Sequence, residues 1–254
     1  MKTIDFSRVL VDSVQLCGLD REEITDSTFI QIRDFANTRL RLAWEYDRWP
    51  DLIRYVQIST ILVSDNVYYV VKPSGAGEVL NVYTKNPNST TRAVSIGFSI
   101  VHTNAEERIV VGTPYPDGVW LEYRIEPVVM TGDKWNASTA YSVNSQVYFD
   151  SGSNSASYHT VAGKPQTGNF YNCITANTNT NPSEATANWS IVRIPYIFSN
   201  YIPRGIFSDY LRSEGQFDSA RLAEAEAQAF LDLEIDKIVR QQGQIQKYNF
   251  IKSY

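Results

Sequence analysis

Apolar and polar positions follow a helical period along residues 218–242, a stretch without proline or glycine. Apolar residues recur there at spacings of three and four, which predicts a long helix with an apolar row along one face. The members of this inner row are Ala220, Ala223, Ala227, Leu231, Ile235 and Ile238. A second apolar row on the same stretch, the outer row, consists of Leu222, Ala225, Ala229 and Leu233.

A helix that packs against one neighbouring surface needs only one apolar row, so two rows indicate two packing partners. We expect the inner row to pack on the N-terminal helices of the same chain and the outer row to meet a neighbouring subunit. The alternative is a terminal helix that packs only on its own domain.

The start of the chain also has a helical pattern. Residues 4–17 predict a short helix that ends at Gly18. Residues 26–46 predict a second helix, which must end before Pro50 because the residue before a proline avoids helical geometry. A further helix is predicted over residues 205–213.

Between these helical ends the period changes from about 3.6 to 2, the period of a β-strand. Turn sequences rich in Gly, Pro and Asn separate the alternating segments, which predicts an antiparallel sheet or small sandwich. The predicted strands are residues 55–62, 67–71, 78–83, 93–100, 108–111 and 118–125.

The composition shifts at about residue 131, and from there to Trp189 the chain is rich in Ser, Thr, Asn and aromatic residues and almost uncharged. This composition favours a small inserted β module. The predicted fold class is therefore α+β. Residues 1–54 and 195–254 form a helical body, residues 55–130 an antiparallel β domain, and residues 131–193 a further small β module.

Composition and motifs give no positive sign of an enzyme. The net charge of −5 over 254 residues argues against a free nucleic-acid-binding protein. His102 and His159 are the only histidines, and no spacing of His, Cys, Asp or Glu fits a metal site. Cys17 and Cys173 are expected to stay reduced thiols. We predict no catalytic residues, no cofactor, no metal and no membrane span.

Three arginines of the second helix, Arg33, Arg39 and Arg41, are candidates for a cationic surface facing DNA or an acidic partner. The alternative is a solvated helix face on which the arginines pair with nearby acids. Those acids are Asp34, Glu45 and Asp47.

Several segments together resemble the head-to-tail adaptor (connector) proteins of tailed bacteriophages. Residues 40–52, LRLAWEYDRWPDL, match a helix with Arg and Trp that ends in Trp-Pro. Residues 78–87, EVLNVYTKNP, and 117–127, DGVWLEYRIEP, match the sheet portion. Residues 201–244 match the C-terminal helices. The order and spacing of these segments carry the resemblance, which covers most of the chain outside residues 131–193.

The resemblance implies a homo-oligomeric ring, commonly a dodecamer, that lies in the virion neck beneath the portal protein. Such a ring lines the channel for double-stranded DNA without reading its sequence, and it presents a docking surface to the tail or nozzle protein. The protein would be made in the host cytoplasm. The end of the chain is implied to contact the portal, and its candidate residues are Ile245, Tyr248, Phe250, Ile251 and Tyr254. A terminal strand or frayed tail on its own domain is the alternative.

The inserted segment has a resemblance of its own, to the small chitin-binding-type carbohydrate-binding modules. It lies in WNASTAYSVNSQVYF (135–149), YNCITANTNTNP (171–182) and the closing Trp189. Members of that family bind sugar through adjacent exposed aromatic residues. The present chain has Ile174, Thr175, Ala176 and Asn177 at that place.

We therefore expect the aromatic residues Trp135, Tyr141 and Trp189 to form the core of the module. Tyr158 and Phe170 are then left as candidate glycan contacts. They support an alternative function, a virion decoration protein that binds a glycan on the host surface.

Overall fold

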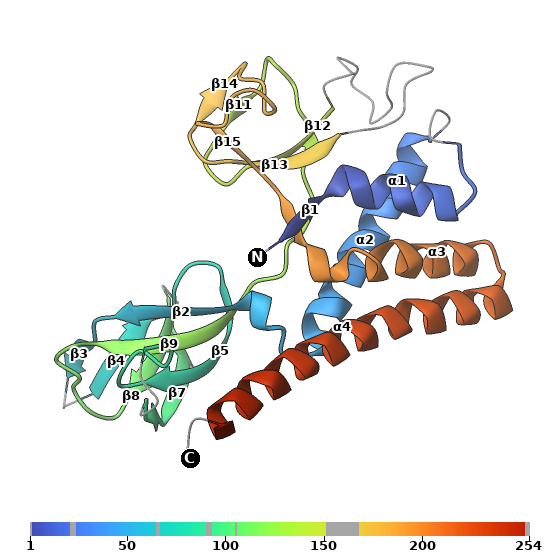
Figure 1. Cartoon of the computed structure of the whole chain (residues 1–254). Coiled ribbons are helices and arrows are strands. Elements are labelled where there is room, and N and C mark those ends of the chain that lie inside the picture. The colour runs from blue at the N-terminus through green and yellow to red at the C-terminus, as the bar shows by residue number, and fades with distance from the viewer. Residues whose placement is uncertain are drawn as a thin grey trace. The chain divides into compact units, whose positions relative to one another are not determined.

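The chain is of mixed α+β class in the computed structural model (Figure 1), which describes residues 2–20, 24–64, 67–89, 93–104, 106–150 and 168–251. The side chains of residues 62–64, 67 and 242–251 are not part of this description. The chain divides into two compact units. The helical unit comprises residues 1–47 and 128–254, and the β unit comprises residues 48–127.

The helical unit is built on four helices within the described residues. They are α1 (Phe6–Leu16), α2 (Asp26–Tyr46), α3 (Tyr201–Ser213) and α4 (Phe217–Ile251). Helix α3 packs on each of the other three, and Figure 1 shows it between α1 and α4. Strand β1 (Thr3–Asp5) pairs antiparallel with β16 (Arg193–Pro195), which ties the start of the chain to the segment before α3. A short 3-10 turn, η2 (Tyr196–Phe198), leads from β16 into that helix.

The helix boundaries follow from local chemistry. The Thr25 side chain accepts a hydrogen bond from Thr28 N over 3.2 Å and so caps α2, whose predicted bounds are confirmed. Helix α3 begins four residues earlier than predicted because proline is tolerated in a first helical turn, where Pro203 lies. Helix α4 continues past the predicted end at residue 242 to Ile251, so Gly243 does not break it.

The inserted module contains a four-stranded sheet in the order β10-β12-β13-β15, and a separate pair, β11–β14. In the sheet, β10 is parallel to β12 and the other pairs are antiparallel. The bounds are β10 (Asp133–Lys134), β11 (Ala140–Tyr141), β12 (Gln146–Phe149), β13 (Asn169–Cys173), β14 (Asn177–Thr178) and β15 (Trp189–Ile191). Trp189 is buried, and Trp135 and Tyr141 pack against its cluster, which confirms the core predicted from the sequence.

The module belongs to the helical unit because the two share a core. Phe6 of α1 and Phe29 of α2 meet Tyr148 and Phe170 of the module, with ring centroids 5.0 Å apart for Phe6–Phe170 and 4.7 Å for Phe29–Tyr148. All four side chains are fully buried. Burial of this much aromatic surface joins the module to α1 and α2 as one hydrophobic core.

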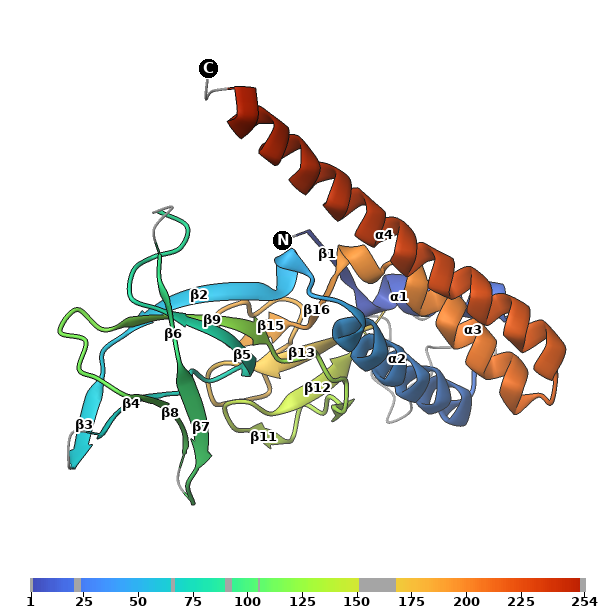
Figure 2. The ribbon, with the colours of Figure 1, turned by 90° about the horizontal axis from the view of Figure 1, so that it is seen from below.

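The β unit contains two four-stranded antiparallel sheets, in the orders β2-β9-β5-β6 and β3-β4-β8-β7 (Figure 2). Apolar residues from both sheets form one cluster, as expected for a small sandwich: Val70, Val79, Val82, Ile109, Val111, Val119 and Leu121. The bounds are β2 (Ile53–Ile58), β3 (Ile61–Ser64), β4 (Val67–Val71), β5 (Ala76–Tyr83), β6 (Ser95–Ile96), β7 (Phe98–His102), β8 (Glu107–Val111) and β9 (Val119–Ile125).

The β unit differs from the prediction in two respects. It comprises residues 48–127 instead of 55–130: a 3-10 turn, η1 (Pro50–Leu52), leads directly into β2, and the chain from Val128 onward belongs to the helical unit. Two predicted strands are each divided, with one segment in each sheet: residues 55–62 into β2 and β3, and residues 93–100 into β6 and β7. Gly97 lies at the second division.

Candidate functional site

Helix α4 presents two different faces, as the two apolar rows predicted. In the inner row, Ala220, Ala227 and Leu231 are at most 1% exposed. The inner row packs mainly on α3, where Phe207 and Leu211 contact it. We had expected the N-terminal helices as its partner, and this expectation was wrong because α3 lies directly alongside α4.

The outer row is exposed along its whole length. Leu222 is 75% exposed and Leu233 is 43% exposed, and Ala225 and Ala229 between them are also exposed. None of these four residues is buried in the part of the chain that the structure describes. Helix α4 therefore satisfies its packing on α3 with one row and leaves a second apolar row open to solvent.

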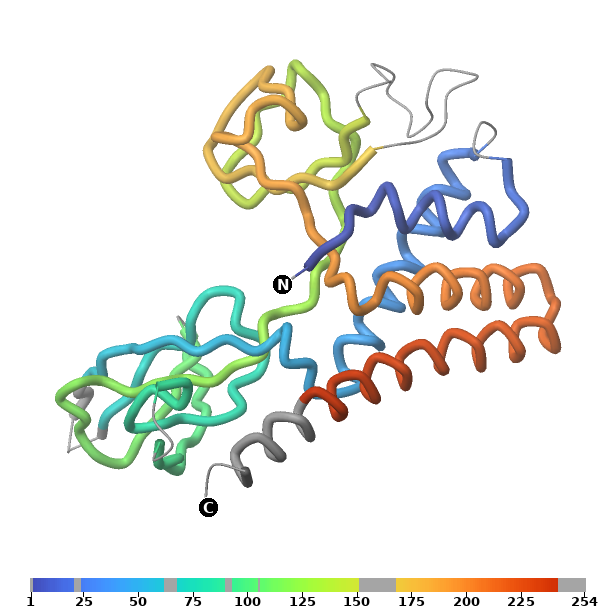
Figure 3. Tube along the Cα trace, in the orientation of Figure 1, coloured from blue at the N-terminus to red at the C-terminus, as the bar shows by residue number. Residues whose placement is uncertain are grey.

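The turn between α3 and α4 fixes the direction of α4 (Figure 3). Gly215 has a φ of +75°, a left-handed conformation that glycine adopts without strain. Gln216 N donates to Leu211 O over 2.8 Å and Gly215 N donates to Arg212 O over 3.1 Å. These two bonds are those of a Schellman motif, which ends α3 and lets α4 return along it.

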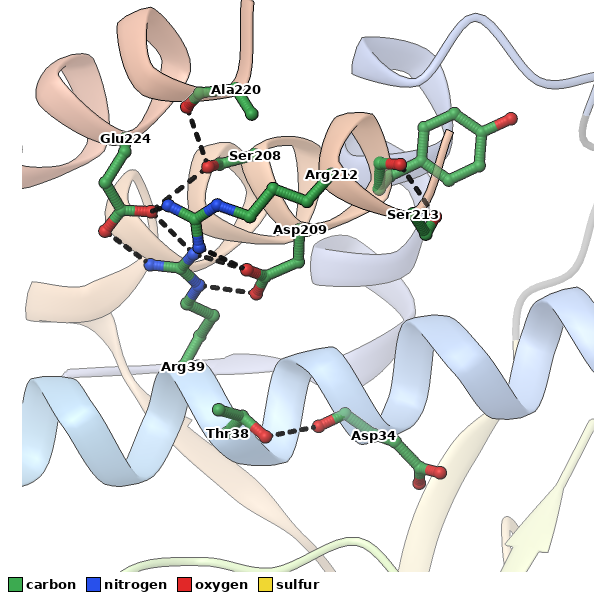
Figure 4. Close-up of polar contacts among 10 residues, drawn as sticks. Asp34, Thr38, Arg39, Ser208, Asp209, Arg212, Ser213, Ala220 and Glu224 are labelled. Atoms are coloured by element: carbon green, nitrogen blue, oxygen red, sulfur yellow. Dashed lines mark hydrogen bonds and ion pairs between the residues drawn. The ribbon is translucent and has the colours of Figure 1, made fainter. Parts of the chain in front are cut away.

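A buried ion network lies beneath the inner row (Figure 4). Arg39 of α2 donates from Nε and Nη2 to the Asp209 carboxylate of α3, over 2.7 and 2.6 Å. Its Nη1 and Nη2 donate to the Glu224 carboxylate of α4, over 2.7 and 2.6 Å. Arg212 also lies 3.2 Å from each carboxylate. One guanidinium therefore joins three helices through paired hydrogen bonds.

The network shifts the pKa of its members. Burial opposes the charge of Arg39, but the hydrogen bonds with Asp209 and Glu224 outweigh burial and hold the pKa of the guanidinium above its ordinary value. The hydrogen bond from Arg39 lowers the pKa of Glu224, against the opposing effect of its own burial. Both groups are therefore charged at neutral pH.

The network leaves no room for a side chain at Gly205 of α3. A Cβ atom there would lie 2.6 Å from Cδ of Arg39, well inside van der Waals contact. The Ser208 hydroxyl, one turn further along α3, donates to Ala220 O over 2.9 Å. Small residues on α3 thus allow the arginine to pass between the helices.

The three candidate channel arginines lie in three different environments. Arg39 is 2% exposed, so its proposal as a channel-facing residue was wrong: its charge is used between helices. Arg33 is partly buried and pairs with Asp34 over 2.9 Å, as the solvated-face alternative expected. Arg41 is exposed on α2.

The candidate portal contacts lie at the end of α4 or beyond it. The backbone of Ile245, Tyr248, Phe250 and Ile251 is helical, while their side chains and the whole of Tyr254 lie outside the described residues.

Of the two candidate glycan contacts, Phe170 is fully buried against Phe6 and Tyr148. Its assignment as a surface contact was wrong, because β13 turns this ring towards α1. Tyr158 lies outside the described residues.

Sequence reasoning missed a second buried charge, Glu122 of β9. It is 2% exposed and accepts hydrogen bonds from Asn81 (2.7 Å), Tyr83 (2.9 Å), Tyr55 (3.1 Å) and Arg48. Burial raises the pKa of Glu122, but these donors together outweigh burial and hold it below its ordinary value. In the sequence, Glu122 lies on the polar side of the alternation in β9, which is the pattern of a strand face open to solvent. The sequence therefore contains no sign that Glu122 is buried.

The described residues contain no cluster of three or more His, Cys, Asp and Glu side chains placed to hold a metal ion. Among the helices that the structure describes, none combines the length and apolarity needed to cross a bilayer. No protein-family model matches the chain, and no curated protein matches it.

Proposed function

We propose that the chain is a structural virion protein, a head-to-tail adaptor whose copies form a ring between the portal and the tail. The observation that carries this proposal is the exposed outer row of α4, with Leu222 at 75% and Leu233 at 43% exposure. The inner row from Ala220 to Leu231 already packs α4 within the chain, so the outer row is available to another copy.

The outer row suits a helix–helix contact between subunits. Its ends are leucines, which bury much apolar surface. Ala225 and Ala229 in its middle are small, so a neighbouring helix can approach closely. A ring needs each copy to offer two different surfaces, and the outer row supplies one of them.

The resemblance to adaptor proteins assigns the remaining partners of the proposed ring. The last segment, residues 244–254, would contact the portal, and the opposite side of the ring would receive the tail or nozzle protein. Double-stranded DNA would pass through the channel without sequence specificity. Of the candidate arginines, Arg41 is the one that α2 leaves exposed to face it. The protein would lie in the virion neck.

The glycan-binding alternative has less support. The full burial of Phe170 removes one of its two candidate contacts. Retention of the protein on chitin beads, lost on Tyr158→Ala, would favour that alternative over a module that only packs against α1 and α2.

Paired substitutions on α4 test the ring proposal. Ala229→Glu places a charge in the exposed outer row and should leave the folded monomer intact while preventing assembly on the portal. Ala227→Glu, two residues away, places the same charge at a fully buried position and should unfold the helical unit. Circular dichroism and mass measurement with purified portal report the two effects separately. Normal assembly of Ala229→Glu would contradict the proposal.

A further inference from the structure

Strand β7 is an open edge of its sheet. The strand order is β3-β4-β8-β7, so β8 pairs with one side of β7, and the sheet order places no strand of the described residues on its other side. Figure 2 shows β7 at this edge. Soluble proteins usually protect such edges with Lys, Pro or a bulge. The sequence of β7, FSIVH, has neither Lys nor Pro, and its ladder with β8 runs through five residue pairs without a register shift.

Two of the four exposed side chains of this edge are apolar. Ile100 is 42% exposed and Val101 is 44% exposed. Ile100 lies opposite Ile109, a core residue of β8, so it belongs to the core-facing side of the sheet although it is only partly covered. The edge therefore presents unpaired backbone together with apolar surface.

Hydrogen bonds at the hairpin turn fix which backbone groups point outward. Thr103 N donates to Glu106 O over 3.0 Å and closes the turn between β7 and β8. Glu107 O accepts from Lys72 N over 3.0 Å, so it points away from His102. Because bonded and non-bonded pairs alternate along an antiparallel ladder, the outward N–H and C=O groups are those of Phe98, Ile100 and His102.

We propose that β7 pairs with β7 of a second copy of this chain, antiparallel and about a two-fold axis at Ile100. In this register Ile100 lies opposite Ile100 of the second copy, and Phe98 lies opposite its His102. The residues brought together are those whose backbone groups point outward, so each pair exchanges both N–H···O bonds. Ser99 then faces Val101 of the second copy across a non-bonded pair.

The charged side chains around this edge are compatible with the approach of a second copy, because each has a partner of opposite charge in its own chain. Glu107 is paired with Lys72 and with His102, whose Nδ1 lies 2.9 Å from its carboxylate. Arg108 Nε pairs with Glu106 over 2.7 Å. The charges beside β7 are thus matched within one chain, and the antiparallel register keeps the two His102 side chains apart.

The opposite edge of the same sheet is a poorer match for β7. The pairing of β3 with β4 shifts register between Leu62 and Ser64, so β3 does not offer a regular edge of the same length. An isologous contact between two β7 strands uses the one regular edge of the sheet twice.

The contact is small. Five residues a side bury far less than the roughly 1,600 Å² of a typical stable interface, so we expect weak, concentration-dependent dimers. The proposal uses the β unit alone and does not rest on the adaptor role, which uses α4.

Single cysteines test the register. In Ile100→Cys the two cysteines would lie opposite each other with Cα atoms about 5.5 Å apart, within disulfide range. Mild oxidation should therefore give a disulfide-linked dimer. Ser99→Cys alone should not form a linked dimer. Residue 99 of one chain is a diagonal neighbour of residue 99 of the other, and their Cα atoms lie about 7–8 Å apart. A mixture of Ser99→Cys and Val101→Cys should give a mixed dimer. The wild-type protein controls for Cys17 and Cys173.

Ile100→Pro provides an independent test without a new cysteine. The N–H of Ile100 does not take part in the ladder with β8, so proline should preserve the fold while removing one outward donor. Sedimentation equilibrium over a concentration series should show the association constant falling at least about tenfold. Three results would overturn the proposal. Ser99→Cys and Ile100→Cys could cross-link equally, or neither could give the dimer. Alternatively, folded Ile100→Pro could keep the association constant of the wild-type protein.

Discussion

The guanidinium of Arg39 on α2 donates to the carboxylate of Glu224 on α4 over 2.6 Å, and it holds Asp209 of α3 at the same time. The side chain of Arg39, which is 2% exposed, thereby connects α2 to α3 and α4, which lie more than 150 residues further along the sequence. Helix α4 carries the outer row on its other face, so the network orients the surface that we assign to the ring contact.

Replacement of Arg39 should destabilise the helical unit strongly. Arg39→Met keeps most of the buried volume but leaves two carboxylates without their main partner, which typically costs about 3–5 kcal/mol of unfolding free energy. Urea unfolding followed by circular dichroism measures it. Arg41→Met is the matched control: the residue is exposed on the same helix, and its effect should stay within about 0.5 kcal/mol.

Gly205→Ala should destabilise the protein through the same arginine. The added methyl group would lie 2.6 Å from Arg39 Cδ, in a side chain that its ion pairs hold in place, so we expect a cost of about 1–3 kcal/mol. In an Arg39→Ala background the clash disappears, and Gly205→Ala should then cost much less. Equal costs in both backgrounds would show that the two residues are not coupled.

Stability should fall in mild acid. The Arg39 hydrogen bond lowers the pKa of Glu224 below its ordinary value of 4.5, so the folded state binds this proton more weakly than the unfolded state does. The contribution of Glu224 is present above about pH 4.5 and is lost as the pH falls through the lower folded-state pKa.

Glu224→Gln should therefore be less stable than the wild-type protein at pH 7, and the difference should shrink as the pH falls below 4.5. The pKa of Glu122 in the β unit is also lowered. Because Glu122 is the same in both proteins, the difference between wild type and Glu224→Gln reports the Glu224 carboxylate alone. A difference that stays constant from pH 7 to pH 3 would contradict the role of the Glu224 charge.

Phe170→Ala should act on stability. The ring is fully buried against α1 and the module, so its removal should cost about 3–5 kcal/mol. Thermal unfolding measures this loss. Val143→Ala is a suitable control, because Val143 is 52% exposed in the same module. An unchanged melting temperature in Phe170→Ala would mean that the module and α1 do not share a core.

The sequence predicted those elements whose pattern is purely local. The alternation of residues 118–125 appears as β9, and the spacing of three and four in α4 separates its buried row from its exposed row. The divided strands were not predicted, because the change of sheet near Gly97 depends on how distant strands pair.

Arg39 was misassigned because it was grouped with Arg33 and Arg41 as an outward residue of α2. Its spacing contained a usable signal: Ile32, Ala36, Arg39 and Ala43 fall at intervals of four, three and four, which places the arginine within the buried stripe of α2. Its partners could not be identified, because Asp209 and Glu224 lie on helices far along the sequence.

The mass of the purified protein mixed with purified portal tests the central claim most directly. We predict a complex in which many copies of the chain join one portal ring, and we predict that Ala229→Glu fails to form it. A protein that stays monomeric and does not bind the portal at any tested concentration would contradict the adaptor function.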